Sequence, residues 1–277
     1  MTVQMNGNDA LIQYRADLNV ASITLDAPQR RNALSTRMIG ELREAIAAAV
    51  ADPVVRVIVI DHTGPVFCAG ADLKESAAAT RLEDLPAAHL AELLADICEA
   101  PKPVVVAARG GAKGGGMGLI AAADLVIAEH DAPMAFSEVR LGVVPAVIAP
   151  VVARRLDAGL MRRLFLTGES FTAVQAQSWG LVALAVVADA FAKRQGALVE
   201  SLLAGGPSAQ AGIKVLTATP GLRETLRAEA ARTAEFFFSE EGREGVRSFI
   251  EKRPAPWVGL PAADRPDRSH LCAHSWP

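Results

Sequence analysis

Two short glycine-bearing stretches are the residues of this chain best suited to chemistry. They are residues 67–74 (FCAGADLK) and residues 114–119 (GGGMGL). Small residues allow the backbone to approach a substrate oxygen closely, and a helix that starts after the second stretch would add the positive end of its dipole. We therefore predict that backbone N–H groups from both stretches form an oxyanion hole.

A titratable side chain, Glu138, follows the second stretch by about 20 residues, within residues 136–142 (FSEVRLG). A carboxyl group in an apolar pocket has a raised pKa, which suits proton transfer near neutral pH. The alternative interpretation is a surface glutamate at the start of a helix, where it would interact favourably with the dipole. We favour Glu138 as a general acid or base.

Six stretches, in this order along the chain, resemble those of the crotonase superfamily, the enoyl-CoA hydratases and isomerases. They are residues 26–35 (DAPQRRNALS), the two glycine stretches, residues 164–169 (LFLTGE), residues 179–182 (WGLV) and residues 249–253 (FIEKR). The resemblance covers residues 10–257. It implies an α/β fold, a crotonase-like spiral of repeated ββα units with a helical C-terminal region that makes trimer contacts.

The resemblance also implies an assembly, and the residue pattern with its Gly205-Gly206-Pro207 break indicates domain boundaries. The spiral core with the acyl-CoA site would span residues 1–205, the C-terminal helical region residues 206–257, and a loosely ordered tail residues 258–277. The expected assembly is a homotrimer or a dimer of trimers.

Site residues follow from the same resemblance. The oxyanion donors would be the backbone N–H groups of Ala71 and Gly115, and Glu138 would transfer the proton. The expected coenzyme A contacts are Ala69, Asp72, Leu73 and Lys74, with Arg30 and Arg31 near the phosphates and with Phe249 and Lys252 reaching the coenzyme from an adjoining subunit. For the basic residues, a solvated surface is an equally good interpretation.

Gly118 departs from the best-known hydratases, which resemble this chain but carry a second glutamate there. One carboxylate suffices to shift a double bond, so the departure favours an isomerase. The second glycine stretch, residues 137–142 (SEVRLG) and residues 145–150 (PAVIAP) instead resemble a hydratase branch that includes enzymes of methylglutaconyl-type acyl-CoA. We place an enoyl-CoA hydratase first, an enoyl-CoA isomerase second, and a non-catalytic acyl-CoA-binding protein as the alternative of another class.

Three other motifs are weaker. Residues 116–121 (GMGLIA) match a dinucleotide-binding fingerprint, but seven residues separate the preceding strand from it, whereas the fingerprint follows its strand at once. Cys68 has no histidine partner in its sequence context, so we predict a buried structural cysteine. The His270 to His274 segment has neither an acidic residue nor a second cysteine to complete a metal site, so we expect no metal.

Composition and charge exclude several classes of protein. The 277 residues carry a net charge of −3, which gives no reason to expect nucleic-acid binding. No segment approaches the roughly 18 apolar residues of a membrane span, and residues 1–10 lack the features of a signal peptide. Three scattered cysteines fit a reducing compartment, so we expect a cytoplasmic protein without a membrane partner and without a cofactor beyond the coenzyme A of the substrate.

Alternating strands and helices predict a mixed or parallel sheet covered by helices. Hydrophobic residues make up 51% of the chain and aromatic residues 5%, so the core should consist of small aliphatic side chains. The predicted strands are residues 11–15, 20–25, 55–61, 104–108, 125–128 and 182–187. The predicted helices are one capped by Ser35 or Thr36 and ended by residues 52–53, one over residues 82–98, one ending near Ala123, and an almost wholly helical region after Ala149, with three helical stretches in residues 208–251.

Overall fold

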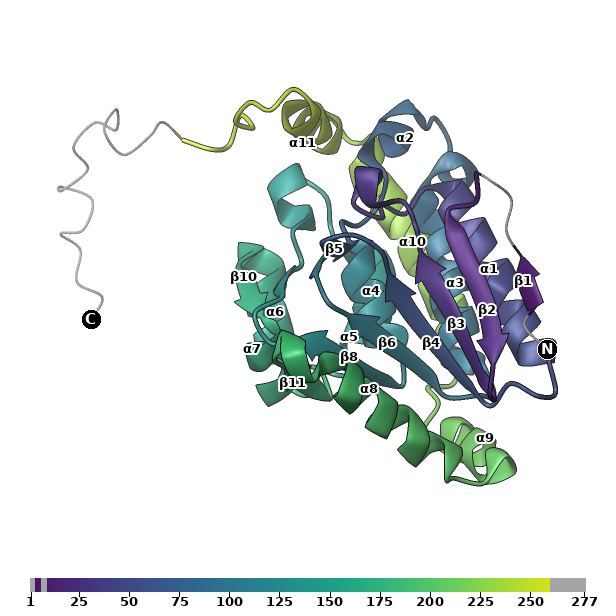
Figure 1. The fold of residues 1–277 in the computed structure, drawn as a ribbon. Coiled ribbons are helices and arrows are strands. Elements are labelled where there is room, and N and C mark those ends of the chain that lie inside the picture. Colours follow the sequence, from purple (N-terminus) through teal and green to yellow (C-terminus); the bar gives the residue numbers. More distant parts are fainter. Residues whose placement is uncertain (1–2, 6–8, 260–277) are drawn as a thin grey trace.

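Two β-sheets and the helices around them make up the fold (Figure 1). The structure is a computed structural model and describes residues 3–5 and 9–259. The segment from His270 to His274 and nearly all of the predicted tail lie outside the described residues.

The larger sheet has seven strands in the order β1-β2-β3-β4-β6-β8-β11. Strands β1, β2 and β3 pair antiparallel, and the pairs from β3 to β11 are parallel, so the predicted mixed sheet is confirmed. The bounds are β1 Val3–Met5, β2 Ile12–Asp17, β3 Val20–Leu25, β4 Val57–His62, β6 Val104–Ala108, β8 Leu125–Glu129 and β11 Leu184–Val186.

A smaller sheet of four strands has the order β10-β9-β7-β5. The bounds are β5 Val66–Cys68, β7 Gly111–Lys113, β9 Pro133–Ala135 and β10 Ser170–Thr172. Three times in succession the chain contributes one strand to the larger sheet and the next to the smaller sheet: β4 then β5, β6 then β7, β8 then β9. Helical segments follow each pair, which confirms the expected spiral of ββα units.

Helices follow the strands throughout the chain. The α-helices are α1 Thr36–Ala51, α2 Leu73–Ala78, α3 Pro86–Glu99, α4 Gly115–Ala122, α5 Ala149–Val152, α6 Ala158–Thr167, α7 Ala173–Ser178, α8 Ala188–Leu203, α9 Pro207–Leu216, α10 Leu222–Phe238 and α11 Glu240–Ile250. Short 3-10 helices are η1 Pro28–Arg30, η2 Leu82–Asp84, η3 Glu138–Leu141 and η4 Ala146–Ile148. Ser35 caps α1, because its hydroxyl accepts a hydrogen bond from the Met38 N–H at 3.2 Å.

Alternate residues of the central strands build two cores, as the period of two in a strand requires. Ile58 and Ile60 of β4 belong to the main core, together with buried side chains of α1, α3 and α4. Val57 and Val59 face the other way and pack in a smaller cluster with Phe191 of α8. Helices therefore cover both faces of the larger sheet.

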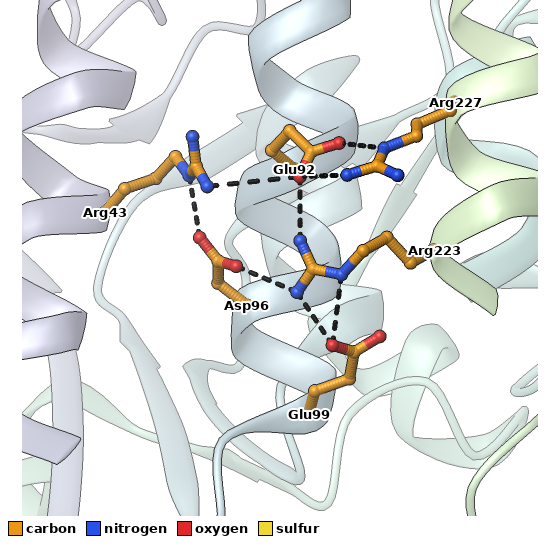
Figure 2. Close-up of polar contacts among 6 residues, drawn as sticks. All are labelled: Arg43, Glu92, Asp96, Glu99, Arg223 and Arg227. Carbon is orange, nitrogen blue, oxygen red and sulfur yellow. Dashed lines mark hydrogen bonds and ion pairs between the residues drawn. The ribbon is translucent and has the colours of Figure 1, made fainter.

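An ion-pair network fastens α10 to α3 of the same chain (Figure 2). The Arg223 guanidinium contacts Glu92 at 2.7 Å, Asp96 at 2.9 Å and Glu99 at 2.7 Å. Arg227 binds Glu92 as well, and its hydrogen bond is the main cause that lowers the pKa of Glu92. Arg43 of α1 completes the network through Asp96, at 2.6 Å. The C-terminal region is thus held on its own spiral core.

Two features differ from the predicted elements. The helix predicted over residues 82–98 is a 3-10 turn followed by α3, because Pro86 starts a new helix and Leu85 before it is extended. Four three-residue strands of the smaller sheet were also missed, among them β10 in the region predicted as almost wholly helical. Such short strands lack a detectable period, and pairing with a distant strand defines them.

Candidate active site

The first glycine stretch turns sharply between β5 and α2. Gly70 has a φ of +95°, a conformation that favours glycine, and a Cβ atom there would lie 3.1 Å from the Lys113 carbonyl oxygen. The Leu34 N–H donates to the Gly70 carbonyl at 2.8 Å, and the Asp72 N–H donates to the Leu34 carbonyl at 3.0 Å. These bonds hold the two peptide groups that flank Ala71 against Leu34. The Ala71 N–H takes part in neither bond.

The second glycine stretch meets the first at the start of α4. A Cβ atom on Gly70 would lie 3.5 Å from the Gly115 nitrogen, and one on Gly115 would lie 3.8 Å from the Ala71 nitrogen. Within the described part of the chain, neither the Ala71 N–H nor the Gly115 N–H has a hydrogen-bond acceptor. Gly115 is the first residue of α4, where N–H groups have no partner inside the helix. The structure thus places two free amide donors side by side.

Glu138 begins η3 and turns its carboxyl group toward the second glycine stretch. A Cβ atom on Gly114 would lie 3.3 Å from Glu138 Oε1. The other oxygen, Oε2, is buried and has no hydrogen-bond partner among the described residues. Burial raises the pKa of Glu138 to about 7, outweighing the hydrogen bond to its own backbone N–H, which lowers it. A group of this kind can exchange protons near neutral pH.

A cavity of about 480 Å³ contains the two amide donors and the carboxyl group. Its wall is largely apolar, and both the spiral core and the C-terminal helices contribute to it. The apolar side chains include Leu90, Leu141, Val143, Val144, Val147, Ile148, Phe237 and Phe249. An apolar, partly closed cavity with few polar groups is typical of a small-molecule site. This arrangement can stabilise an oxyanion and move a proton beside it.

Comparison with known proteins identifies the family. Residues 15–260 match the enoyl-CoA hydratase/isomerase family. A solved enoyl-CoA hydratase from Mycobacterium avium superposes with a TM-score of 0.80 and 37% identity, covering 90% of this chain and 100% of that one. The chain belongs to the enoyl-CoA hydratase/isomerase family. The crotonase resemblance of the sequence is thereby confirmed.

Two relatives of this enoyl-CoA hydratase/isomerase family member indicate the range of reactions. A provisionally named enoyl-CoA hydratase of Thermus thermophilus is 34% identical over 246 residues, which are 85% of this chain and 96% of that protein. A carnitinyl-CoA dehydratase of Proteus mirabilis is 30% identical over 251 residues, which are 87% of this chain and 95% of that protein. Both names describe acyl-CoA chemistry.

Most predicted site residues of this family member line the cavity. They are Arg31, Ala69, Ala71, Leu73, Gly115, Glu138 and Phe249. Phe249 of α11 lies against the cavity of its own chain. Its predicted contact with the coenzyme of an adjoining subunit stays a prediction. The roles of these residues stay predictions.

Four predicted coenzyme A contacts are not among the lining residues: Arg30, Asp72, Lys74 and Lys252. Asp72 has another task, because its carboxylate caps α2 by accepting from the N–H groups of Lys74 at 3.0 Å and Glu75 at 3.2 Å. Lys252 follows α11 with a φ of +55°. Contact of these four residues with the coenzyme stays a prediction.

The structure adds lining residues that the sequence analysis missed. Lys113 directly precedes the second glycine stretch and Arg140 stands two residues after Glu138, so their position beside a motif was the available signal. Thr233, Ser248 and Arg253 also line the cavity. They lie roughly a hundred residues downstream of Glu138, and only the packing of α10 and α11 brings them to it.

Gly118 has a neighbour that fills the space beside it. A Cβ atom there would lie 2.6 Å from Ile148 Cγ2 and 3.4 Å from Leu94 Cδ2. Ile148 is fully buried, so it cannot give way without repacking. Ile148 therefore occupies the space that a side chain at position 118 would need.

The competing motifs find structural explanations. Strand β7 separates β6 from the second glycine stretch, so the match to a dinucleotide fingerprint lacks the direct strand-to-helix turn. Cys68 is fully buried, as predicted, and burial raises the pKa of its thiol to about 12. Within residues 3–5 and 9–259, no His, Cys, Asp and Glu side chains gather in threes as metal ligands. No helix in these ranges is both long and apolar enough to cross a membrane.

Proposed function

We propose that this chain is an enoyl-CoA hydratase, which adds water across the double bond of a 2-enoyl-CoA thioester. One observation carries the proposal: the free N–H groups of Ala71 and Gly115 adjoin each other in the cavity that also holds the buried carboxyl of Glu138. Such donors stabilise the negative charge that develops on a thioester carbonyl, and loss of one typically costs about 3 to 4 kcal/mol.

Glu138 handles the proton in this proposal. As carboxylate it takes a proton from water while the water oxygen bonds to C3, and the C2–C3 π electrons move onto the thioester as an enolate. The amides of Ala71 and Gly115 hold the enolate oxygen. Glu138 then returns the proton to C2, which gives a 3-hydroxyacyl-CoA. A pKa raised to about 7 suits both transfers, because a group titrating near the working pH can accept and donate.

An enoyl-CoA isomerase is the second candidate, and the contact of Ile148 with Gly118 favours it. Ile148 fills the space from which a second carboxylate at position 118 would act. Among the described residues that line the cavity, Glu138 is the one with a carboxyl group. A single carboxyl group can remove a proton from C2 of a 3-enoyl-CoA and return it to C4.

Separate incubation with 2-enoyl-CoA and 3-enoyl-CoA thioesters tests the proposal. A hydratase converts the 2-enoyl substrate into a 3-hydroxy product, detected by mass spectrometry as a gain of one water. Isomerisation of the 3-enoyl substrate without hydration would instead establish the second candidate. If neither thioester reacts while acyl-CoA still binds in calorimetry, the chain is a non-catalytic acyl-CoA-binding protein.

The proposal includes a homotrimer or a dimer of trimers. Exposed apolar side chains of α9, Ile213, Val215 and Leu216, offer surface that a neighbouring subunit could cover. Light scattering after size-exclusion chromatography measures the mass, and a monomer would contradict this part of the proposal. A cytoplasmic location belongs to the same proposal, and imaging of the tagged protein in its host tests it.

A further inference from the structure

A buried hydroxyl group connects α10 to the loop behind the cavity. Thr233 of α10 is 4% exposed and lines the cavity. Its Oγ1 accepts a hydrogen bond from the Val147 N–H at 3.0 Å and donates one to the Glu229 carbonyl at 3.0 Å. Because the single hydroxyl proton goes to Glu229, the oxygen is oriented as an acceptor for Val147.

The Val147 N–H depends on this hydroxyl. Val147 is the second residue of η4, and the first N–H groups of a helix have no partner inside it. The residue is buried, which denies the N–H a replacement bond from bulk water. Pro145, just before η4, has no N–H of its own to donate. Thr233 is therefore the side chain that anchors this loop at Val147.

The next residue, Ile148, transmits the position of the loop to α4. Its side chain lies against Gly118, where a Cβ atom would come within 2.6 Å of Ile148 Cγ2. The Gly118 N–H donates to the Gly114 carbonyl at 3.2 Å, which closes the first turn of α4. Gly115 belongs to the same turn and lines the cavity. A shift of Ile148 would therefore displace an oxyanion donor.

We propose that Thr233 is a positioning residue, which acts through Val147 and Ile148 to fix the first turn of α4 and its Gly115 donor. This inference rests on the proposed function, since it assigns the donor a catalytic task. Thr233 itself is not positioned to donate a hydrogen bond to substrate, because its hydroxyl donates to the Glu229 backbone carbonyl. Helix α10 is in this way part of the catalytic architecture, although Thr233 lies 86 positions from Val147 in the loop that it holds.

Three variants in the full-length protein test the role of the hydroxyl. Thr233→Val keeps the shape and removes the hydroxyl, and Thr233→Ser keeps the hydroxyl and removes the methyl group. Thr225→Val is the matched control on the same helix, because the Thr225 hydroxyl makes the equivalent bond to the Gly221 carbonyl, at 2.9 Å, and no other among the described residues. Each variant is assayed for kcat and KM with the reacting thioester, and hydrogen exchange of residues 143–150 is followed by mass spectrometry.

We expect Thr233→Val to lower kcat about tenfold with KM within about twofold, because the donor is misplaced and the substrate pocket is kept. The kcat of Thr233→Ser should stay within about threefold of the wild-type value, and the kcat of Thr225→Val should equal the wild-type value. Exchange of residues 143–150 should accelerate in Thr233→Val alone. An unchanged kcat in Thr233→Val, or an equal loss in Thr233→Ser, overturns the proposal.

Two further readouts keep the test decisive. If Thr233→Val does not fold, Ile148→Ala removes the other end of the connection, and the proposal requires it to lower kcat with no change in the exchange of α10. A normal kcat in Ile148→Ala overturns it. If the wild type turns over no thioester, the proposed function fails. Faster exchange of residues 143–150 in Thr233→Val would then still show that Thr233 holds the loop, and only its role in catalysis would be refuted.

Discussion

Gly118 of α4 and Ile148 of η4 touch so closely that residue 118 has no room for a side chain. A Cβ atom at position 118 would lie 2.6 Å from Ile148 Cγ2, and real Cβ atoms are essentially never found that close to another heavy atom. This contact joins the helix that presents the Gly115 amide to the loop that follows Glu138. Changes at either residue should therefore be felt in the site.

Gly118→Ala should destabilise the protein by about 1 to 3 kcal/mol, since the added methyl group overpacks a fully buried contact. Urea denaturation followed by circular dichroism measures the free energy of unfolding. Gly196→Ala in α8 is the control, because nothing lies within 4 Å of its Cβ position. That variant should gain up to about 1 kcal/mol from helix propensity. A similar gain for Gly118→Ala would contradict the contact.

Glu138→Gln should lower kcat by about 10² to 10⁴ and leave substrate binding largely intact, because the amide cannot accept or return a proton. Stopped-flow or steady-state kinetics with the reacting thioester measures the effect. Glu83→Gln provides a surface control, since the Glu83 side chain is 71% exposed. Unchanged turnover in Glu138→Gln would remove this carboxyl group from the mechanism.

The pH dependence of stability should carry the signature of Glu138. Burial raises its pKa to about 7 in the folded state, above the usual 4.5 of a glutamate, so the folded protein binds the proton more tightly than the unfolded chain. Protonated Glu138 therefore adds to the free energy of unfolding; this contribution is fully present below about pH 4.5 and is lost as the pH rises through about 7. It amounts to roughly 3 kcal/mol.

Denaturation of the wild type and Glu138→Gln at pH 5, 6, 7 and 8 measures this contribution. The difference in unfolding free energy between the two proteins should change steadily in favour of Glu138→Gln as the pH rises. A difference that stays constant from pH 5 to pH 8 would show that the carboxyl titrates in the ordinary range. The rising limb of kcat with pH should have its midpoint near 7 in the wild type.

Arg223→Ala should destabilise the protein by about 2 kcal/mol, because it leaves Glu92, Asp96 and Glu99 facing one another without their shared cation. The loss should shrink at 1 M salt, where repulsion among the carboxylates is screened. Arg81→Ala is the control, because Arg81 is 71% exposed and its ion pairs should contribute less than about 1 kcal/mol. Thermal unfolding at two salt concentrations separates the two arginines.

Much of the fold could be predicted from the sequence because its signals are local. The hairpin of β2 and β3, the Ser35 cap of α1 and the continuous apolar strand β6 each depend on residues close together in the chain. The smaller sheet could not be predicted in this way. Its three-residue strands form only where a partner strand already lies in place, as β10 does against β9.

The candidate site also combines features that are encoded locally with features that depend on tertiary packing. The types and spacing of residues determined the glycine stretches, the candidate acid Glu138 and the structural role of Cys68, because a backbone turn or a buried thiol is encoded where it stands. Only the tertiary structure decided that the Ala71 and Gly115 amides adjoin, that Ile148 fills the space at Gly118 and that Thr233 reaches Val147. Those relationships join segments 30 to 86 residues apart, and their geometry depends on how the two sheets and α10 pack.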